Sequence, residues 1–260
     1  MHLMVDTGMN RSGIDEQHWE ETFRLAKQAE AEFGLQVVGV MSHLACADEP
    51  ADPYNDAQRL AFVRAIELAR EHGLEVPVNH LANSPGTLTR EDFAFEQVRT
   101  GVVLYGLDPV EAPLDVDGQG SARRGAAKAL RPAMTWSAGL VAVKPISKGE
   151  GVSYGLTWTA PEDGWTAVVP VGYADGLPRA WQGAVEVTIH GRTYPQVGRV
   201  CMDQFVVWLG ANEHGVRAGD EAIIFGEGGM SAAELARRAG TIHYEVVSIP
   251  GGRLDREYVG

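Results

Sequence analysis

Apolar and polar positions follow two different periods along the first part of the chain. Short apolar runs predict buried strands at residues 3–5, 37–41, 76–79 and 102–105. Between them, residues 15–33 and 56–72 carry apolar side chains at helical spacing, with Phe33 and Leu60 among those expected to face inward. Strands that alternate with helices indicate βαβ units and a parallel sheet, which is either a small open sheet or half of a longer parallel barrel.

The pattern changes further along the chain. Residues 111–129 form a polar, glycine-rich connector. Apolar runs separated by Gly, Pro and Asp follow it at residues 139–143, 165–169, 185–189 and 221–224. One helix is expected among them, opened by the capping-box pattern of Ser231 and Glu234. We therefore predict a βα domain over residues 1–129 and a mostly β domain over residues 130–260.

The composition of the chain argues against several classes of function. Among 260 residues, 22 Lys and Arg stand against 35 Asp and Glu, a formal net charge of −13, which argues against a nucleic-acid partner. No apolar run approaches the roughly 20 residues that span a bilayer, so no membrane span is expected. Cys46 and Cys201 are too few for a disulfide framework, and the first residues lack the features of a signal peptide. We expect a cytoplasmic protein.

Polar side chains follow the predicted strands of the first half. Active-site residues of parallel βα folds lie at the carboxyl ends of strands. His43 and His80 occupy such positions, as structural hydrogen-bonding residues or as parts of a site. The segment around Ser84 is either a plain turn or a phosphate contact, and Gly101 could let backbone amides approach a phosphate.

In the second half, Tyr154 and Tyr173 stand beside glycines. Each tyrosine either covers a glycine turn or presents a phenol in a cleft. Residues 200–204 are either a strand with one buried Asp or part of the same cleft. The spacing of Cys and His fits no metal site, and no phosphate-binding loop motif or dinucleotide fingerprint is present.

Taken together, these segments resemble the alanine racemase family. The motifs, in order, are DTGMNRSG (6–13), SHLACAD (42–48), NS (83–84), RTGVVLYG (99–106), GVSYG (151–155), GYADG (172–176) and GRVCMDQ (198–204). The resemblance implies α/β plus β architecture: a partial (β/α)8 barrel, its second half, followed by a mostly β C-terminal domain. It further implies a pyridoxal 5'-phosphate (PLP) enzyme that interconverts L- and D-alanine, supplying D-alanine for peptidoglycan. The family works as a head-to-tail homodimer whose sites combine both subunits.

The resemblance also assigns roles to residues. Tyr154 would be the base on the L side, with His43 beside it, and Arg99 would face the PLP pyridine nitrogen with His80 behind it. The PLP phosphate would be held by Ser84, Gly101, Val102 and, unless its ring packs on the surface, Tyr258. The substrate carboxylate would meet Arg11 and the backbone of Met202. Tyr173, Arg179, Arg199 and Asp48 resemble the polar lining of the substrate channel.

The lysine that binds PLP in the family has no counterpart in this chain. The lysines present are Lys27, Lys128, Lys144 and Lys148, and none stands in the family's lysine motif. Met4 replaces a lysine found in many members, and Asp255 replaces a usual proline. We therefore expect a racemase that lacks its N-terminal part and is inactive alone. Two alternatives stay open: a non-catalytic fragment that offers Tyr154 to a partner subunit, and a related PLP racemase or decarboxylase acting on another amino acid.

Overall fold

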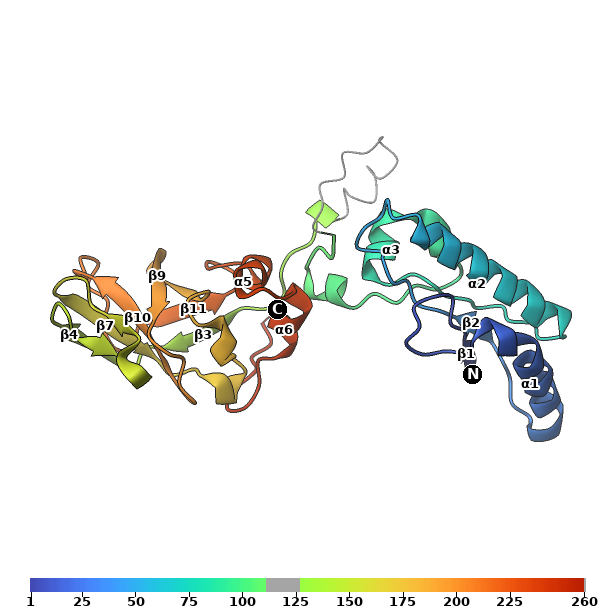
Figure 1. Ribbon diagram of the computed structural model, residues 1–260, viewed down its shortest axis with the longest axis horizontal. Helices are drawn as coiled ribbons and strands as arrows, with labels where there is room; N and C mark the ends of the chain where they lie inside the picture. The colour runs from blue at the N-terminus through green and yellow to red at the C-terminus, as the bar shows by residue number, and fades with distance from the viewer. Residues whose placement is uncertain (111–126, 260) are drawn as a thin grey trace. The chain divides into compact units, whose positions relative to one another are not determined.

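The computed structural model describes residues 1–110 and 127–259, which form two compact units, Met1–Arg131 and Pro132–Gly260 (Figure 1). Most of the polar connector expected at residues 111–129 lies outside the described residues. In the described ranges, no helix is both long enough and apolar enough to cross a bilayer.

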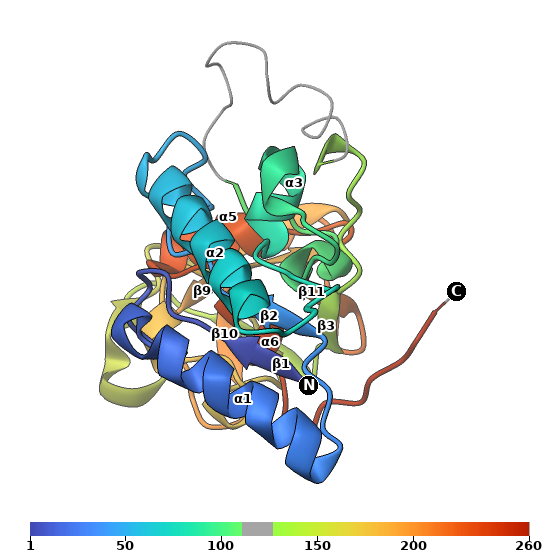
Figure 2. The same ribbon diagram turned by 90° about the vertical axis from the view of Figure 1, so that its right-hand side faces the viewer.

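The first unit is built around two parallel strands. Strand β1 (His2–Met4) pairs with β2 (Gly39–Met41), with His2 opposite Gly39. Helices α1 (Trp19–Phe33) and α2 (Tyr54–Glu71) lie beside this pair (Figure 2). Shorter elements are α3 (Ser84–Thr89) and the 3-10 turns Glu16–His18, Glu91–Phe93 and Val102–Tyr105.

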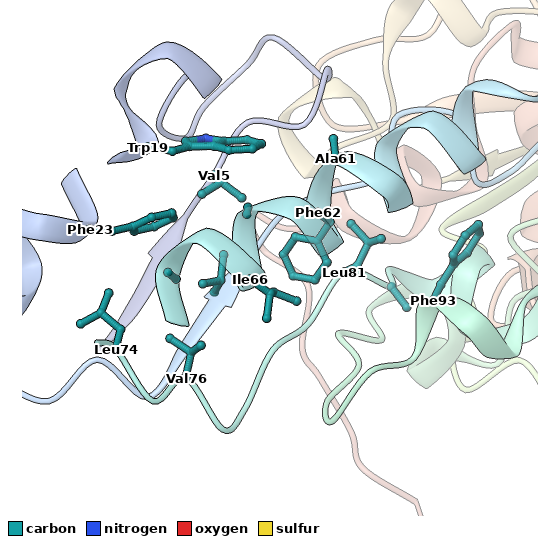
Figure 3. Close-up of a cluster of buried hydrophobic side chains, with 14 of the residues drawn as sticks. Val5, Trp19, Phe23, Ala61, Phe62, Ile66, Leu74, Val76, Leu81 and Phe93 are labelled. Carbon is teal, nitrogen blue, oxygen red and sulfur yellow. The ribbon is translucent and has the colours of Figure 1, made fainter. Parts of the chain in front are cut away.

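One apolar cluster joins these elements. Trp19 and Phe23 of α1 and Phe62 of α2 pack with Val5 and Leu81 (Figure 3). The helical spacing correctly predicts α1, which ends at Gly34 in the left-handed conformation. The inward assignments of Phe33 and Leu60 are wrong, because these side chains are 73% and 56% exposed. Burying them would need a wider apolar face than the two strands of this unit cover.

The strand predicted at residues 76–79 does not form. Val76 has a φ of 37°, outside the extended region. Val78 N–H donates to Val38 O at 2.9 Å, and a bridge pairs Met41 with His80. The ladder is interrupted because the side chain of Asn79 accepts the Val40 N–H at 3.0 Å, in place of a backbone carbonyl. The Val78 carbonyl also approaches Gly39 so closely that a Cβ there would lie 1.7 Å from its oxygen.

The strand predicted at residues 102–105 is also wrong. These residues form a 3-10 turn, in which Leu104 N–H donates to Gly101 O at 2.9 Å, and Gly106 ends the turn at a φ of 72°. Only Val102 of the four is buried. A short apolar run cannot by itself separate a buried strand from a turn that packs one side chain.

The second unit holds a seven-stranded sheet with antiparallel pairings in the order β3-β11-β8-β9-β10-β7-β4. Its strands are β3 (Trp136–Gly139), β4 (Ala142–Ile146), β7 (Gly164–Val169), β8 (Glu186–Ile189), β9 (Arg192–Val197), β10 (Phe205–Gly210) and β11 (Glu221–Phe225). A separate hairpin pairs β5 (Gly151–Val152) with β6 (Trp158–Thr159). The 3-10 turns are Tyr154–Leu156, Tyr173–Asp175 and Arg179–Trp181.

Several details of the second unit differ from the sequence prediction, which did not include strands β9 and β10. The run 139–143 is not one strand, because the chain leaves β11 after Gly139 and joins β7 from Ala142. Helix α5 (Ala232–Ala239) begins as predicted, with Ser231 Oγ accepting the Glu234 N–H at 3.1 Å. A second helix, α6 (His243–Ser248), follows it and was not expected.

Candidate active site

The guanidinium of Arg99 is the centre of a polar cluster at the carboxyl end of β2. Its Nη1 donates to His80 Nδ1 at 2.6 Å and to the His80 carbonyl at 3.0 Å. Its Nη2 donates to the Ser42 carbonyl at 2.5 Å and to His43 Nδ1 at 3.2 Å. The expected contact of His80 with Arg99 is therefore present within the first unit, and His43, which was expected beside Tyr154, also contacts Arg99.

These contacts set the protonation of both histidines. A guanidinium only donates, so His80 and His43 must each accept at Nδ1, and each neutral ring carries its proton on Nε2. Burial lowers the pKa of His80 to about 4, helped by the charges of Arg99 and His2. Burial, and then the charges of Arg99 and Arg11, lower the pKa of His43 as well. Two neutral imidazoles thus flank one half-buried cation.

A second contact joins Ser84 to Gly101. The Gly101 N–H donates to Ser84 Oγ at 2.8 Å, and Val102 follows directly in the turn. Ser84 is the first residue of α3, and Asn83 caps that helix by accepting the Gly86 N–H at 3.2 Å. Because Ser84 Oγ already accepts one hydrogen bond, its hydroxyl proton is free to be donated, as an anion contact requires.

Arg11 lies in the loop that follows β1. Asp6 Oδ1 shapes this loop by accepting the N–H groups of Gly8 at 2.8 Å and Asn10 at 3.2 Å. Tyr54 closes it from α2 by donating its hydroxyl to the Gly8 carbonyl at 2.7 Å. The side chain of Arg11 is exposed, and its charge acts on the pKa of His43, so the loop brings Arg11 towards the cluster.

In the second unit, Tyr154 stands at the tip of a tight turn after β5. Ser153 at a φ of 64° and Gly155 at 73° enclose it, and the tyrosine side chain is 71% exposed. The Arg199 guanidinium lies against Gly155, since a Cβ built there would be 3.4 Å from Arg199 Cζ. Ser153 Oγ donates to the Arg199 carbonyl at 2.8 Å.

The loops that carry Met202 and Tyr173 are hydrogen-bonded to each other. Tyr173 N–H donates to the Cys201 carbonyl at 3.1 Å, and Ala174 N–H donates to the Met202 carbonyl at 2.8 Å. The side chains of Met202 and Tyr173 are both exposed. The second unit therefore gathers Tyr154, Tyr173 and Met202 on adjoining loops.

Tyr258 differs from the other predicted site residues. It lies in the extended segment after α6, and its side chain is 90% exposed. No contact within the described residues of the second unit brings it to Tyr154 or Met202. Its assignment to a phosphate remains a prediction.

Two polar groups were missed by the sequence analysis. Asp175 is buried and accepts Arg253 through both carboxylate oxygens, at 2.9 and 2.7 Å. Gln58, in the middle of α2, is buried and bonded to the loops of both strands. The spacing of Gln58 to Phe62, Ala65 and Ala69 was a usable signal, because it places a polar residue on the apolar face of the helix. In the described ranges, no cluster of His, Cys, Asp and Glu could hold a metal ion.

The architecture defines a class: a parallel βα domain with an Arg–His cluster at its strand ends, followed in sequence by an antiparallel β domain. Family models agree with this division. The model "Alanine racemase, N-terminal domain" matches residues 1–109, and "Alanine racemase, C-terminal domain" matches residues 133–258.

Individual relatives give the same result. The alanine racemase of Corynebacterium efficiens is 55% identical over 99% of this chain and 66% of its own length. That of Corynebacterium glutamicum is 53% identical over 99% of this chain and 67% of its own. The crystal structure of alanine racemase from D-cycloserine-producing Streptomyces lavendulae has a TM-score of 0.90 at 42% identity, covering 100% of this chain and 66% of that one.

The chain belongs to the alanine racemase family. Its fold is the alanine racemase fold, a barrel-type N-terminal domain followed by a β-rich C-terminal domain. It spans about two thirds of the length of the curated relatives that it matches.

Proposed function

We propose that this chain takes part in the PLP-dependent interconversion of L- and D-alanine, which supplies D-alanine for peptidoglycan. The observation that carries the proposal is the Arg99 cluster, whose residues the family resemblance assigns to the site, in a chain 55% identical to an alanine racemase. We further propose that residues 1–129 are the second half of a (β/α)8 barrel and that residues 130–260 are the β domain. The proposed setting is the cytoplasm.

The residues present could contact the pyridine ring and the phosphate of PLP. Arg99 would face the pyridine nitrogen: its two terminal nitrogens are engaged, and among the described residues none accepts from its Nε–H. Ser84 and the amide of Val102 would hold the phosphate, and Tyr258 could add a hydroxyl. The Gly101 amide, which donates to Ser84 Oγ here, would join them by exchanging that hydrogen bond for one to the phosphate. When bound, the cofactor supplies an electron-withdrawing ring that stabilises negative charge on the substrate Cα. An arginine at the ring nitrogen keeps that nitrogen unprotonated and so limits the withdrawal.

The residues do not fit the covalent attachment. Lys27 lies on α1 and pairs with Glu30 at 3.0 Å, and Lys128, Lys144 and Lys148 fall in or after the connector. Within the described residues, no hydrogen bond or ion pair joins a lysine to the Arg99 cluster. This chain would supply contacts to the ring, the phosphate and the substrate, but no covalent link to the cofactor.

Tyr154 is the proposed base on the L side of the substrate Cα. A phenol works as a base only when its ionised form is stabilised by hydrogen bonds or nearby positive charge. His43 carries its proton on Nε2, since Nδ1 accepts from Arg99, and that N–H could donate to a phenol oxygen. Arg199, packed against Gly155, adds a positive charge on the tyrosine's own side.

Arg11 and the backbone of Met202 are the proposed contacts of the substrate carboxylate. A guanidinium binds a carboxylate through paired N–H groups, and a backbone amide adds a directed donor. We propose a homodimer in which the Arg99 cluster of one subunit meets the partner subunit's Tyr154. In that arrangement His43 and Tyr154 face each other across the interface.

Subunit complementation tests the proposal. The chain is co-expressed with a full-length alanine racemase whose own equivalent of Tyr154 is phenylalanine. We expect alanine racemisation to be restored by the wild-type chain and not by Tyr154→Phe. The matched control is Tyr194→Phe, which removes a buried hydroxyl of the same unit and should restore activity as well as the wild type does.

The outcomes separate the candidate functions. Rescue by wild type alone supports the shared-site proposal, whereas equal rescue by Tyr154→Phe or no rescue contradicts it. Rescue without any activity of the chain alone would mark it as a contributor of Tyr154 to a partner. Turnover of serine or lysine in preference to alanine would favour the related racemase or decarboxylase.

A further inference from the structure

The amide of Gln58 is a buried polar group on a helix face that is otherwise largely apolar. Gln58 is 0% exposed, and Ala61, Phe62 and Ala65 are buried beside it on α2. A buried amide is retained without cost only where its donors and acceptor are satisfied. Both ends of this side chain are hydrogen-bonded, and each partner lies in a loop of the candidate active site.

Both ends of the Gln58 amide bond to the turn that carries His43. Its Oε1 accepts the Ala45 N–H at 2.8 Å, and its Nε2 donates to the His43 carbonyl at 3.0 Å. The backbone on both sides of Leu44 is therefore bonded to one rigid helix. This sets where the His43 ring leaves the backbone, and so where it meets Arg99.

The same amide reaches the loop that carries Arg11. Gln58 Nε2 also donates to Thr7 Oγ1 at 3.3 Å, and Thr7 Oγ1 shares a 2.8 Å hydrogen bond with Ser42 Oγ. The Ser42 carbonyl is in turn a partner of Arg99. Thr7, Ser42 and Gln58 thus form one buried network that ties the loop after β1 to the turn after β2.

We propose that Gln58 is a positioning residue, which holds the Arg11 loop and the His43 turn in register so that Arg11 and Arg99 both face the His43 ring. The inference deepens the proposed racemase function and rests on it for its catalytic meaning. Gln58 itself touches neither ring nor guanidinium and acts through the backbone of the two loops. Its amide is uncharged, so any change it causes at His43 must come through position.

The pKa of His43 reports that position without requiring turnover. Burial and the charges of Arg99 and Arg11 are the causes that lower it, and each weakens if the loops move apart. The full chain is labelled at the histidine ring carbons, and the titration of His43 is followed by NMR, with His43→Gln identifying the resonance. The titration needs no enzyme activity, so it can be interpreted even if the complementation test contradicts the racemase proposal. Likewise, an unchanged pKa in the Gln58 variant would leave the result of the complementation test unaffected.

Gln58→Met keeps the length of the side chain and removes all three hydrogen bonds. We expect the pKa of His43 to rise towards its ordinary value. The matched control is Asn55→Leu, because Asn55 is a buried amide of the same helix that donates only to the carbonyls of Cys46 and Glu49, each at 3.0 Å. An unchanged pKa in Gln58→Met, or an equal rise in Asn55→Leu, would overturn the proposal.

A milder variant covers the case in which Gln58→Met does not fold. Thr7→Val keeps the shape of the side chain and cuts only the link from Gln58 and Ser42 to the Arg11 loop. In the wild-type background, Arg11→Met should raise the pKa of His43, since a positive charge is removed. In the Thr7→Val background the same change should have a smaller effect, and an equal effect would contradict the positioning role.

Discussion

The carboxylate of Asp175 and the guanidinium of Arg253 form a two-bonded ion pair across 78 positions of sequence, with Nε–Oδ1 at 2.9 Å and Nη2–Oδ2 at 2.7 Å. Asp175 is only 1% exposed, and it also accepts the Gly172 N–H at 2.9 Å. Arg253 Nη2 donates further to the Asp203 carbonyl at 3.3 Å. The pair therefore fastens the C-terminal segment to the two loops that carry Tyr173 and Met202.

Arg253→Met should destabilise the second unit. It leaves the buried Asp175 carboxylate without its counter-ion and without two charge-assisted hydrogen bonds. Since the guanidinium is exposed and water can replace some of its contacts, we expect a modest loss of stability. Urea unfolding of the full chain measures the change. The control is Arg64→Met, which breaks an exposed ion pair with Glu16.

The same ion pair predicts an acid dependence of stability. The Arg253 hydrogen bonds, with the Gly172 N–H, lower the pKa of Asp175 below its ordinary value. A lowered carboxyl pKa gives stability that is complete above the unfolded value of about 3.9 and is lost as the pH falls through the folded value. The difference in unfolding free energy between wild type and Arg253→Met should therefore be constant near neutrality and shrink below about pH 4. A difference that stays constant down to pH 2 would contradict this assignment.

Gly172→Ala should disturb the loop of Met202. A Cβ at Gly172 would lie 2.4 Å from the carbonyl oxygens of both Cys201 and Met202, a clash with backbone that no rotamer relieves. Overpacking of this kind costs about 1–3 kcal/mol. Gly139→Ala is the control, because its nearest neighbour, the Gly219 oxygen, is 4.0 Å away. Thermal unfolding should show a clear loss for the first variant and almost none for the second, and equal effects would refute the close approach.

Tyr194→Phe should leave the protein at least as stable as the wild type. The Tyr194 hydroxyl is buried and has no hydrogen-bond partner among the described residues, and burial raises its pKa. A buried polar group without a partner costs about 1–3 kcal/mol, so its removal recovers part of that cost. A marked loss of stability in chemical unfolding would show that the hydroxyl does make a stabilising contact.

The sequence predicted the parts of the fold that depend on local pattern. The helices around Phe23 and Phe62 follow from apolar spacing, and the start of α5 follows from Ser231 as an N-cap. The strand prediction for residues 76–79 was wrong because the side chain of Asn79 takes the place of a backbone hydrogen-bond partner. The strand prediction for residues 102–105 was wrong because a short apolar run is compatible with a turn as well as with a buried strand.

The candidate site shows the same division. Strand-end position and the family motif together located His43, His80 and Arg99, which the structure brings into contact. Asp175 finds Arg253 only through the fold, and no local pattern indicates that contact. The place of Gln58 on the apolar face of α2 was a signal in the sequence that the prediction did not use. The sequence therefore predicted the contact of Arg99 with His80 but not the ion pair that fixes the loops of Tyr173 and Met202.

The contact between Arg99 and His80 predicts how the stability of the fold depends on pH. Burial, the positive charge of Arg99 and that of His2 lower the pKa of His80 to about 4. An unfolded histidine titrates near 6.5, so between these values the unfolded chain binds the extra proton and stability falls as the pH is lowered. NMR titration of the folded chain should find His80 neutral down to about pH 5, and His2→Gln should raise its pKa slightly. In His80→Gln, the decline in unfolding free energy from pH 6.5 to 4 should be shallower than in wild type. Titration of His80 near 6.5 in the folded protein would contradict the contact with Arg99, because a protonated Nδ1 could not accept the guanidinium N–H at 2.6 Å.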